Sequence, residues 1–190
     1  MRPKRLSQVC ACLILILAPA FASRQLPDYP TRPAGDYSIK AAQAGAIVGI
    51  ESLDDSDLQK KYFNSHLTEK GILPVFIVIQ NTSSSDSIIF DKSAIGLADP
   101  ADLSGKQNRS IASKLGSGGL LDLGQMRDIT DEREVMMKKQ IRSKTLAPGS
   151  LVSGFVYVPV PRSQQRPKIH LQVPITGLQT GETTVLNLDF

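Results

Sequence analysis

The sequence predicts a mainly β protein, an antiparallel β-sandwich with one or two helices inserted between its strands. The first observation is the run from Ile72 to Ile79, which is apolar and rich in β-branched residues. The second is a group of three strand-like runs that end the chain, at residues 151–160, 168–175 and 183–190. The third is that two helical patterns lie between the early and the late strands. Parallel βαβ units would instead alternate the two types regularly, so an antiparallel sandwich is favoured.

The first 22 residues form a segment of a different kind. An apolar run from Val9 to Leu17 is followed by Ala20-Phe21-Ala22, the small-x-small pattern that signal peptidase recognises. A positive head precedes this run and contains Arg2, Lys4 and Arg5. The apolar core is about ten residues long, shorter than the ~20 needed to cross a bilayer. We therefore expect residues 1–22 to be a signal peptide cut after Ala22, and the mature protein to be periplasmic or secreted with no transmembrane span.

Removal of this segment changes the composition. Both cysteines, Cys10 and Cys12, lie inside it, so the mature chain has no disulfide, thiol nucleophile or thiolate metal ligand. The segment also holds three of the 22 basic residues and none of the 18 acidic ones, which leaves a net charge of about +1. This near balance removes most of the basis for expecting a nucleic-acid partner.

The mature chain begins with a Pro-rich leader, residues 23–36, which is expected to be extended and to act as a tether or as an N-terminal arm. A single sandwich domain is expected over residues 37–190. Its first part, Tyr37 to Glu51, fits one strand or a pair of short strands interrupted at Gly45.

The segment from Gly71 to Phe90 is the expected centre of the domain. Its first apolar run is followed by a polar break from Asn81 to Asp86 and by a second apolar run from Ile88. This pattern predicts a core-forming hairpin. Because Val75, Ile77 and Ile79 alternate with other apolar residues, both faces of the first strand are apolar, which predicts a central strand buried on both sides.

The first helical insertion is expected near residues 55–67. An acidic group at residues 54–57 precedes Leu58, Tyr62 and Phe63, which recur at helical spacing. The acids are interpreted as an N-cap and as partners of the helix dipole. A calcium loop is disfavoured, because Gly is missing at its sixth position and His66 stands where its final Glu belongs.

The second helical insertion is expected over residues 123–144. Acidic residues lie early and basic residues late, as suits the helix dipole, and Glu134 and Lys138 form an i,i+4 pair. Its predicted buried face contains Met126, Ile129, Met137 and Ile141. We interpret it as a surface helix packed across the sandwich; the alternative is a helix that binds a partner or a membrane surface.

Two segments together carry a family resemblance. They are Leu73-Pro-Val-Phe-Ile-Val-Ile-Gln-Asn81-Thr-Ser with Ser87-Ile-Ile-Phe90, and Leu146-Ala-Pro-Gly149-Ser-Leu-Val-Ser-Gly154-Phe-Val-Tyr-Val-Pro-Val-Pro161. The region Leu73–Pro161 resembles immunoglobulin-like sandwich domains of bacterial envelope and secreted proteins. In these domains a strand ends in an Asn-x-Ser/Thr turn and a Pro-Gly turn starts a later strand. The resemblance implies an immunoglobulin-like fold and brings no catalytic residues, because the matching positions are turns and core.

The sequence offers no catalytic, cofactor-binding or metal-binding residues that we would assign. His66 and His170 have no second ligand at metal-binding spacing, and Gly116 to Gly119 lacks the Lys-Ser/Thr pair of a phosphate loop. No serine stands in Gly-x-Ser-x-Gly. We expect a non-enzymatic binding or structural module of the bacterial envelope, with another envelope protein or a glycan as partner. The alternatives are a small hydrolase with an unrecognised site and an outer-membrane-associated β protein.

Overall fold

The computed structural model describes residues 26–98, 118–126, 130–161 and 168–190. The expected signal peptide, residues 1–22, lies outside these ranges, as does most of the Gly-rich region from Ala98 to Gly124. Within the ranges, no helix has both the length and the apolar character that crossing a membrane requires.

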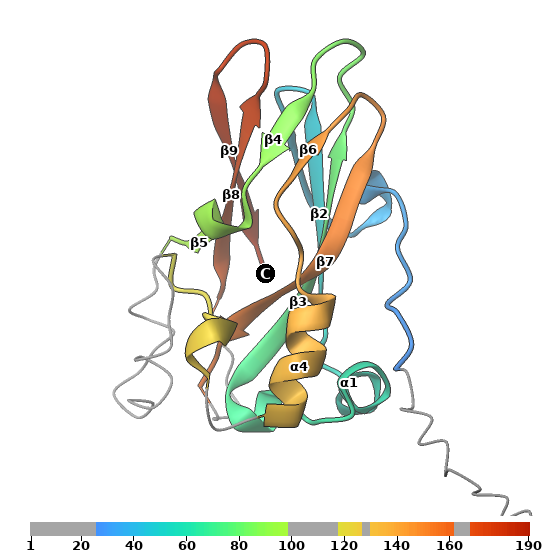
Figure 1. Ribbon diagram of the computed structural model, residues 1–190, viewed down its shortest axis with the longest axis vertical. Helices are drawn as coiled ribbons and strands as arrows, with labels where there is room; N and C mark the ends of the chain where they lie inside the picture. The colour runs from blue at the N-terminus through green and yellow to red at the C-terminus, as the bar shows by residue number, and fades with distance from the viewer. Residues whose placement is uncertain (1–25, 99–117, 127–129, 162–167) are drawn as a thin grey trace, which may run out of the picture.

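The described chain forms two antiparallel sheets (Figure 1), which confirms the prediction of a mainly β protein. Sheet A contains, in spatial order, β1 (Ile39–Gln43), β2 (Ala46–Ser52), β3 (Ile72–Asn81) and β7 (Leu151–Pro159). Sheet B contains β4 (Ile88–Phe90), β5 (Gly96–Leu97), β6 (Lys144–Leu146), β8 (His170–Gly177) and β9 (Thr183–Asp189). The helices are α1 (Ser56–Phe63) and α4 (Thr130–Lys139), with short 3-10 turns η1 (Ala34–Asp36), η2 (Thr68–Lys70), η3 (Lys92–Ala94) and η4 (Leu123–Gln125).

The β3 strand at the centre of sheet A is buried on both faces, and this explains its continuous apolar sequence. Alternate residues of β3, such as Val75 and Ile77, join a core between the two sheets. The residues between them, such as Phe76 and Val78, join a second core on the outer face of the sheet. The α1 and α4 helices lie over that outer face (Figure 1). The prediction that β3 is a central strand buried on both sides is therefore confirmed.

The predicted hairpin from Gly71 to Phe90 is wrong. The β3 strand pairs with β2 and β7 in sheet A, whereas β4 pairs with β6 and β8 in sheet B. The polar break therefore carries the chain from one sheet to the other. Asn81 directs this crossing, because its buried side-chain amide donates to the carbonyls of Asp86 and Leu146 at 2.8 and 2.9 Å. Its side-chain oxygen accepts from the amide of Ser83 at 2.9 Å.

Several strand predictions are confirmed. The region from Tyr37 to Glu51 forms a pair of strands, β1 and β2, joined by a turn in which Ala44 and Gly45 both have positive φ. The three strand-like runs that end the chain become β7, β8 and β9. Along β8, Leu171 and Val173 face the inter-sheet core, as their alternation with polar residues predicts.

The first helical insertion forms α1 with the predicted cap. The Asp55 carboxylate accepts from the amides of Asp57 and Leu58 at 2.8 and 3.0 Å. Of the apolar residues at helical spacing, Tyr62 and Phe63 are buried, whereas Leu58 is 37% exposed and Gln59 beside it is fully buried. The Gln59 amide is satisfied there, since it donates to the Leu53 carbonyl at 2.6 Å and accepts from the Thr68 amide at 3.1 Å.

The second helical insertion is shorter than predicted. The α4 helix ends at Lys139, and Gln140 forms a parallel bridge to Phe155 of β7. The Ile141 amide then donates to the Phe155 carbonyl at 3.0 Å. This segment approaches β7 so closely that a Cβ on Gly154 would lie 2.5 Å from the Ile141 backbone.

The interior of α4 also differs from its predicted face. Met136 is fully buried, whereas Met137, which we expected to be buried, is 47% exposed. Met126 and Ile141 are buried as predicted, although both lie outside α4 itself. Ile129 lies outside the described residues. The predicted pair of Glu134 and Lys138 is confirmed at 2.6 Å.

The described part of the Pro-rich leader packs on sheet A. The Tyr29 ring lies 4.6 Å from the ring of Phe76 and 5.5 Å from that of Phe155, measured between centroids. Lys139 of α4 donates to the Pro27 carbonyl at 2.6 Å and lies 3.6 Å from the Asp28 carboxylate. Residues 26–36 are therefore an arm held against the outer face of the sheet.

Candidate functional site

The two histidines lie in separate places, and each contacts a single polar side chain. The Ser56 hydroxyl lies 2.6 Å from Nδ1 of His66, beside the start of α1. Nδ1 of His170 lies 2.8 Å from the Asp189 carboxylate, across the exposed β8–β9 pair. Among the described residues, no group of three or more His, Cys, Asp or Glu side chains is placed to hold a metal ion.

The glycine segment from Gly116 to Gly119 is described only from Gly118 onward. The Gly118 carbonyl accepts from the Leu97 amide at 2.8 Å. A Cβ at Gly118 would lie 2.3 Å from the Ile95 carbonyl oxygen, so only glycine fits against this strand. The described part of the segment therefore packs beside β5.

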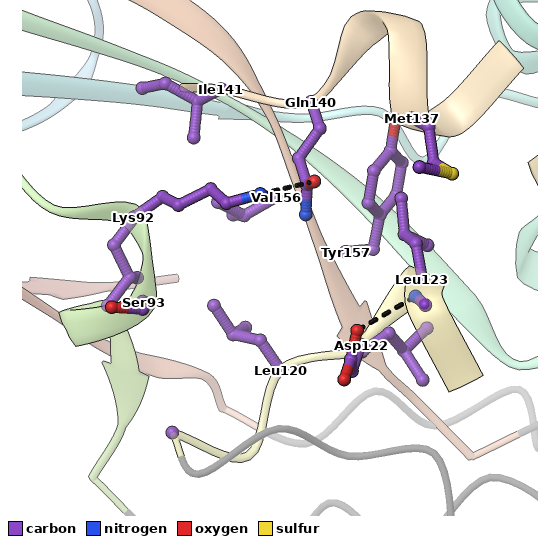
Figure 2. A pocket seen from close by; sticks show the side chains of 14 residues that line it. Lys92, Ser93, Leu120, Asp122, Leu123, Met137, Gln140, Ile141, Val156 and Tyr157 are labelled. Carbon is purple, nitrogen blue, oxygen red and sulfur yellow. Dashed lines mark hydrogen bonds between the residues drawn. The ribbon is translucent and has the colours of Figure 1, made fainter. Parts of the chain in front are cut away.

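A cavity of about 510 Å³ lies between β7, the end of α4, η3 and the segment 118–124. We call it the apolar cavity (Figure 2). Its volume is within the ~300–1,000 Å³ typical of ligand sites. Its apolar lining consists of Ile95, Leu120, Leu121, Leu123, Met137, Ile141, Val156 and the ring of Tyr157. Its polar lining consists of Lys92, Ser93, Asp122 and Gln140. Gly118 and Gly124 also line the cavity.

The walls of the apolar cavity are held by hydrogen bonds. The Tyr157 hydroxyl donates to the Met136 carbonyl at 2.9 Å, which joins β7 to α4. Burial raises the pKa of Tyr157 well above its ordinary value, so its hydroxyl remains a donor at neutral pH. On the other wall, the Asp122 carboxylate accepts from the Gly124 amide at 2.8 Å and starts η4.

The polar side of the cavity is built around η3. Nζ of Lys92 donates to Oε1 of Gln140 at 3.1 Å, and Figure 2 shows the two side chains meeting across the cavity. The neighbouring Asp91 accepts from the Ser93 amide and the Ser143 hydroxyl, both at 2.9 Å. These hydrogen bonds, chiefly the one from the Ser93 backbone, lower the pKa of Asp91. This network places the Lys92 ammonium group beside a mostly apolar space.

A contact network at Glu132 holds α4 to η2 and to the segment that follows α1. Glu132 accepts from the ammonium group of Lys70 and from the Ser65 hydroxyl. The hydrogen bond from Lys70 is the main cause that lowers the pKa of Glu132. The α4 wall of the cavity is therefore fixed from both sides.

A second cavity of about 480 Å³ lies on the other side of Gln140, and we call it the basic groove. Its charged lining residues are Lys138, Lys139, Arg142, Lys144 and Asp28. Its remaining lining residues are Tyr29, Thr31, Phe76, Gln140, Val152, Ser153, Gly154 and Phe155.

Sequence reasoning identified neither cavity. Described residues from the Gly-rich region between Ala98 and Gly124 and from the second helical insertion line the apolar cavity. Leu120 and Leu121 carry no motif of their own, and the residues of β7 were interpreted as core. Neither His66 nor His170 lines either cavity. Comparisons of this chain with protein-family models, with curated proteins and with solved structures find no match.

Proposed function

We propose that this chain is a non-enzymatic, extracytoplasmic binding module of the bacterial envelope, and that it holds an apolar group of a partner protein in the apolar cavity. The export part of the proposal rests on the signal-like residues 1–22 with their cut after Ala22. The binding part rests on one observation, the cavity of about 510 Å³ with its mostly apolar lining.

We also propose that the fold is immunoglobulin-like, and the order of the strands supports this. In such folds the chain crosses to the opposite sheet after its second strand. A later strand returns to the first sheet and pairs with that second strand. The last two strands pair with each other beside the strand that follows the crossing. Here β3 passes to β4, β7 returns to pair with β3, and β8 pairs with both β4 and β9. The β1 strand and the helical layer on sheet A are additions to that pattern.

A protein partner is favoured over a glycan by the chemistry of the cavity. A glycan presents many hydroxyl groups, and each buried hydroxyl needs a hydrogen-bond partner. The cavity offers few polar side chains, and two of them, Lys92 and Gln140, already bond to each other. A Leu, Phe or Met side chain of a partner needs no such hydrogen bond. Its burial in the cavity would favour binding by ~25 cal/mol for each Å² of apolar surface removed from water.

The alternative of a small hydrolase has one supporting contact, the 2.6 Å approach of the Ser56 hydroxyl to His66. A serine nucleophile needs a base at this distance. It also needs an adjacent space for the substrate, and neither residue lines the apolar cavity or the basic groove. We therefore propose a structural role for this contact, which ties the start of α1 to the segment after it.

We expect the substitution Met137→Trp to block the apolar cavity. Met137 lines the cavity and is 47% exposed, so a larger ring can be accommodated there without entering the core. The matched control is Val185→Trp, because Val185 is 40% exposed on β9 and lines neither cavity. The natural chain contains no Trp, so each variant also carries a single fluorescent reporter.

Two measurements on residues 23–190 test the proposal. Anilinonaphthalene sulfonate, an apolar anionic dye, should fluoresce with the wild type and the Val185→Trp variant and lose most of its signal with Met137→Trp. A protein captured from an envelope extract should be retained by the first two and released by the third. Equal dye binding and identical captured proteins for all three forms would contradict the proposed function.

A further inference from the structure

One edge of β7 is open at its beginning. The carbonyls of Phe155 and Tyr157 accept from Ile141 and Leu121 on the side away from β3. Antiparallel strands direct the amide and carbonyl of alternate residues to the same side. The backbone amides and carbonyls of Leu151 and Ser153 therefore also point away from β3. Among the described residues, no backbone hydrogen bond reaches those groups of Leu151 and Ser153 from the open side.

Basic side chains line the groove that contains Ser153 of this open edge. Four of the five charged residues of the basic groove are cations, and its floor includes Ser153 and Gly154 of β7. Lys138 pairs with Glu134, and Lys139 holds the arm at Pro27 and Asp28. The side chains of the other two cations, Arg142 and Lys144, make no hydrogen bond or ion pair with any described residue.

We propose that the basic groove receives an extended acidic segment of a partner protein, which adds a short strand to the open edge of β7. The outward amides and carbonyls of Leu151 and Ser153 would hydrogen-bond its backbone. Arg142 and Lys144 would pair with its Asp or Glu side chains. Two partners are thereby disfavoured: a second copy of this chain would bring the same cations against each other, and a basic segment would be repelled.

The arm defines one wall of this site. The Thr31 hydroxyl lies 3.0 Å from the Ser153 hydroxyl, on the face of sheet A that carries Tyr29. The incoming strand must therefore lie in the plane of the sheet, between the arm and Arg142. This site is separate from the apolar cavity, although Gln140 lines both. The inference does not depend on the proposed function, and the two are tested by different measurements.

A synthetic peptide of alternating Glu and Val tests the site on the full mature chain by NMR titration. We expect the amides of Leu151 and Ser153 to become protected from exchange on binding. The amides of Val152 and Gly154 should change little, because they already bond to β3. Binding should weaken as ionic strength rises, since the groove is open to solvent.

The ion pairs and the backbone hydrogen bonds of the proposal can be tested separately. Charge reversal by Arg142→Glu together with Lys144→Glu should weaken binding by roughly tenfold or more, as expected for the loss of two exposed ion pairs. The matched control, Lys60→Glu together with Lys61→Glu on α1, makes the same change of charge away from the groove and should bind as the wild type does. Methylation of alternate peptide nitrogens should also weaken binding, because it removes the backbone donors.

Three results would overturn the inference. The first is absence of binding at low ionic strength. The second is equal binding by both charge-reversal variants. The third is binding of inorganic polyphosphate or of the N-methylated peptide as tightly as the unmodified peptide, with no selective protection of Leu151 and Ser153. That third result would assign the groove to anions in general.

Discussion

Ile77→Asp is expected to unfold the domain. Ile77 is fully buried in β3, pairs with Ile50 of β2 and Gly154 of β7, and faces the core between the sheets. Removal of the buried side chain lowers the free energy of unfolding by ~2–5 kcal/mol. The unpaired carboxylate that replaces it lowers this free energy further. The total approaches the ~5–15 kcal/mol by which domains are stable. Circular dichroism and thermal unfolding of the purified variant measure the effect.

The same substitution at Ile89 is the matched control. Ile89 lies on β4 and is 37% exposed on the outer side of sheet B. A carboxylate remains hydrated there, so we expect a loss in the free energy of unfolding of about 1 kcal/mol or less. An Ile77→Asp protein that is expressed in soluble form and melts near the wild-type temperature would show that β3 is not buried between two cores.

Asn81→Asp is expected to lower the free energy of unfolding by on the order of 3 to 5 kcal/mol. The Asn81 amide donates to two carbonyls, those of Asp86 and Leu146, in a fully buried position. A carboxylate cannot donate to them and would bring a negative charge against both oxygens. The substitution removes the side-chain link between the crossing from β3 to β4 and Leu146 at the end of β6. Urea denaturation at neutral pH measures it.

Asn187→Asp controls for the chemistry of this change. Asn187 is exposed on β9, and its side-chain oxygen accepts from Gln172 at 3.3 Å, a role that a carboxylate also fills. We expect little change in the denaturation midpoint. If Asn81→Asp and Asn187→Asp have equal midpoints, the Asn81 side chain does not hold the crossing together.

The strands were predictable because their signals are local. The uninterrupted apolar run of β3 requires burial on both faces, and the alternation of β8 and β9 requires burial on one. Pairing was not predictable in the same way. A polar break of six residues suits both a hairpin and a crossing between sheets, and the choice is made by Asn81, whose amide bonds to Leu146, 65 positions later.

The helices show how tertiary contacts override a local pattern. Leu58 belongs to the apolar period of α1, yet it is half-exposed, and the polar Gln59 is buried instead, because Leu53 and Thr68 satisfy its amide. The helical pattern ran on to Lys144, but a bridge to Phe155 extends the chain from Gln140.

The candidate sites could not be predicted, because each assembles residues that are ordinary in their own segment. Leu120, Met137 and Val156 come from three separate parts of the chain, and each has the composition of a core position. The basic groove likewise joins the arm, the end of α4 and β7. A single sequence shows such residues as core or as solvated charge, and only the fold brings them around a common space.

Residue-resolved amide exchange on the mature chain tests most directly whether β3 is the doubly covered strand that supports both sites. Because β3 is paired on both sides, consecutive amides from Phe76 to Ile79 should all exchange slowly, near the rate of global unfolding. In β9, whose only partner among the described strands is β8, alternate amides such as Val185 should exchange quickly. Alternating fast and slow exchange along β3, or rates there equal to those of β9, would contradict the conclusion that β3 is the doubly covered strand that supports both sites.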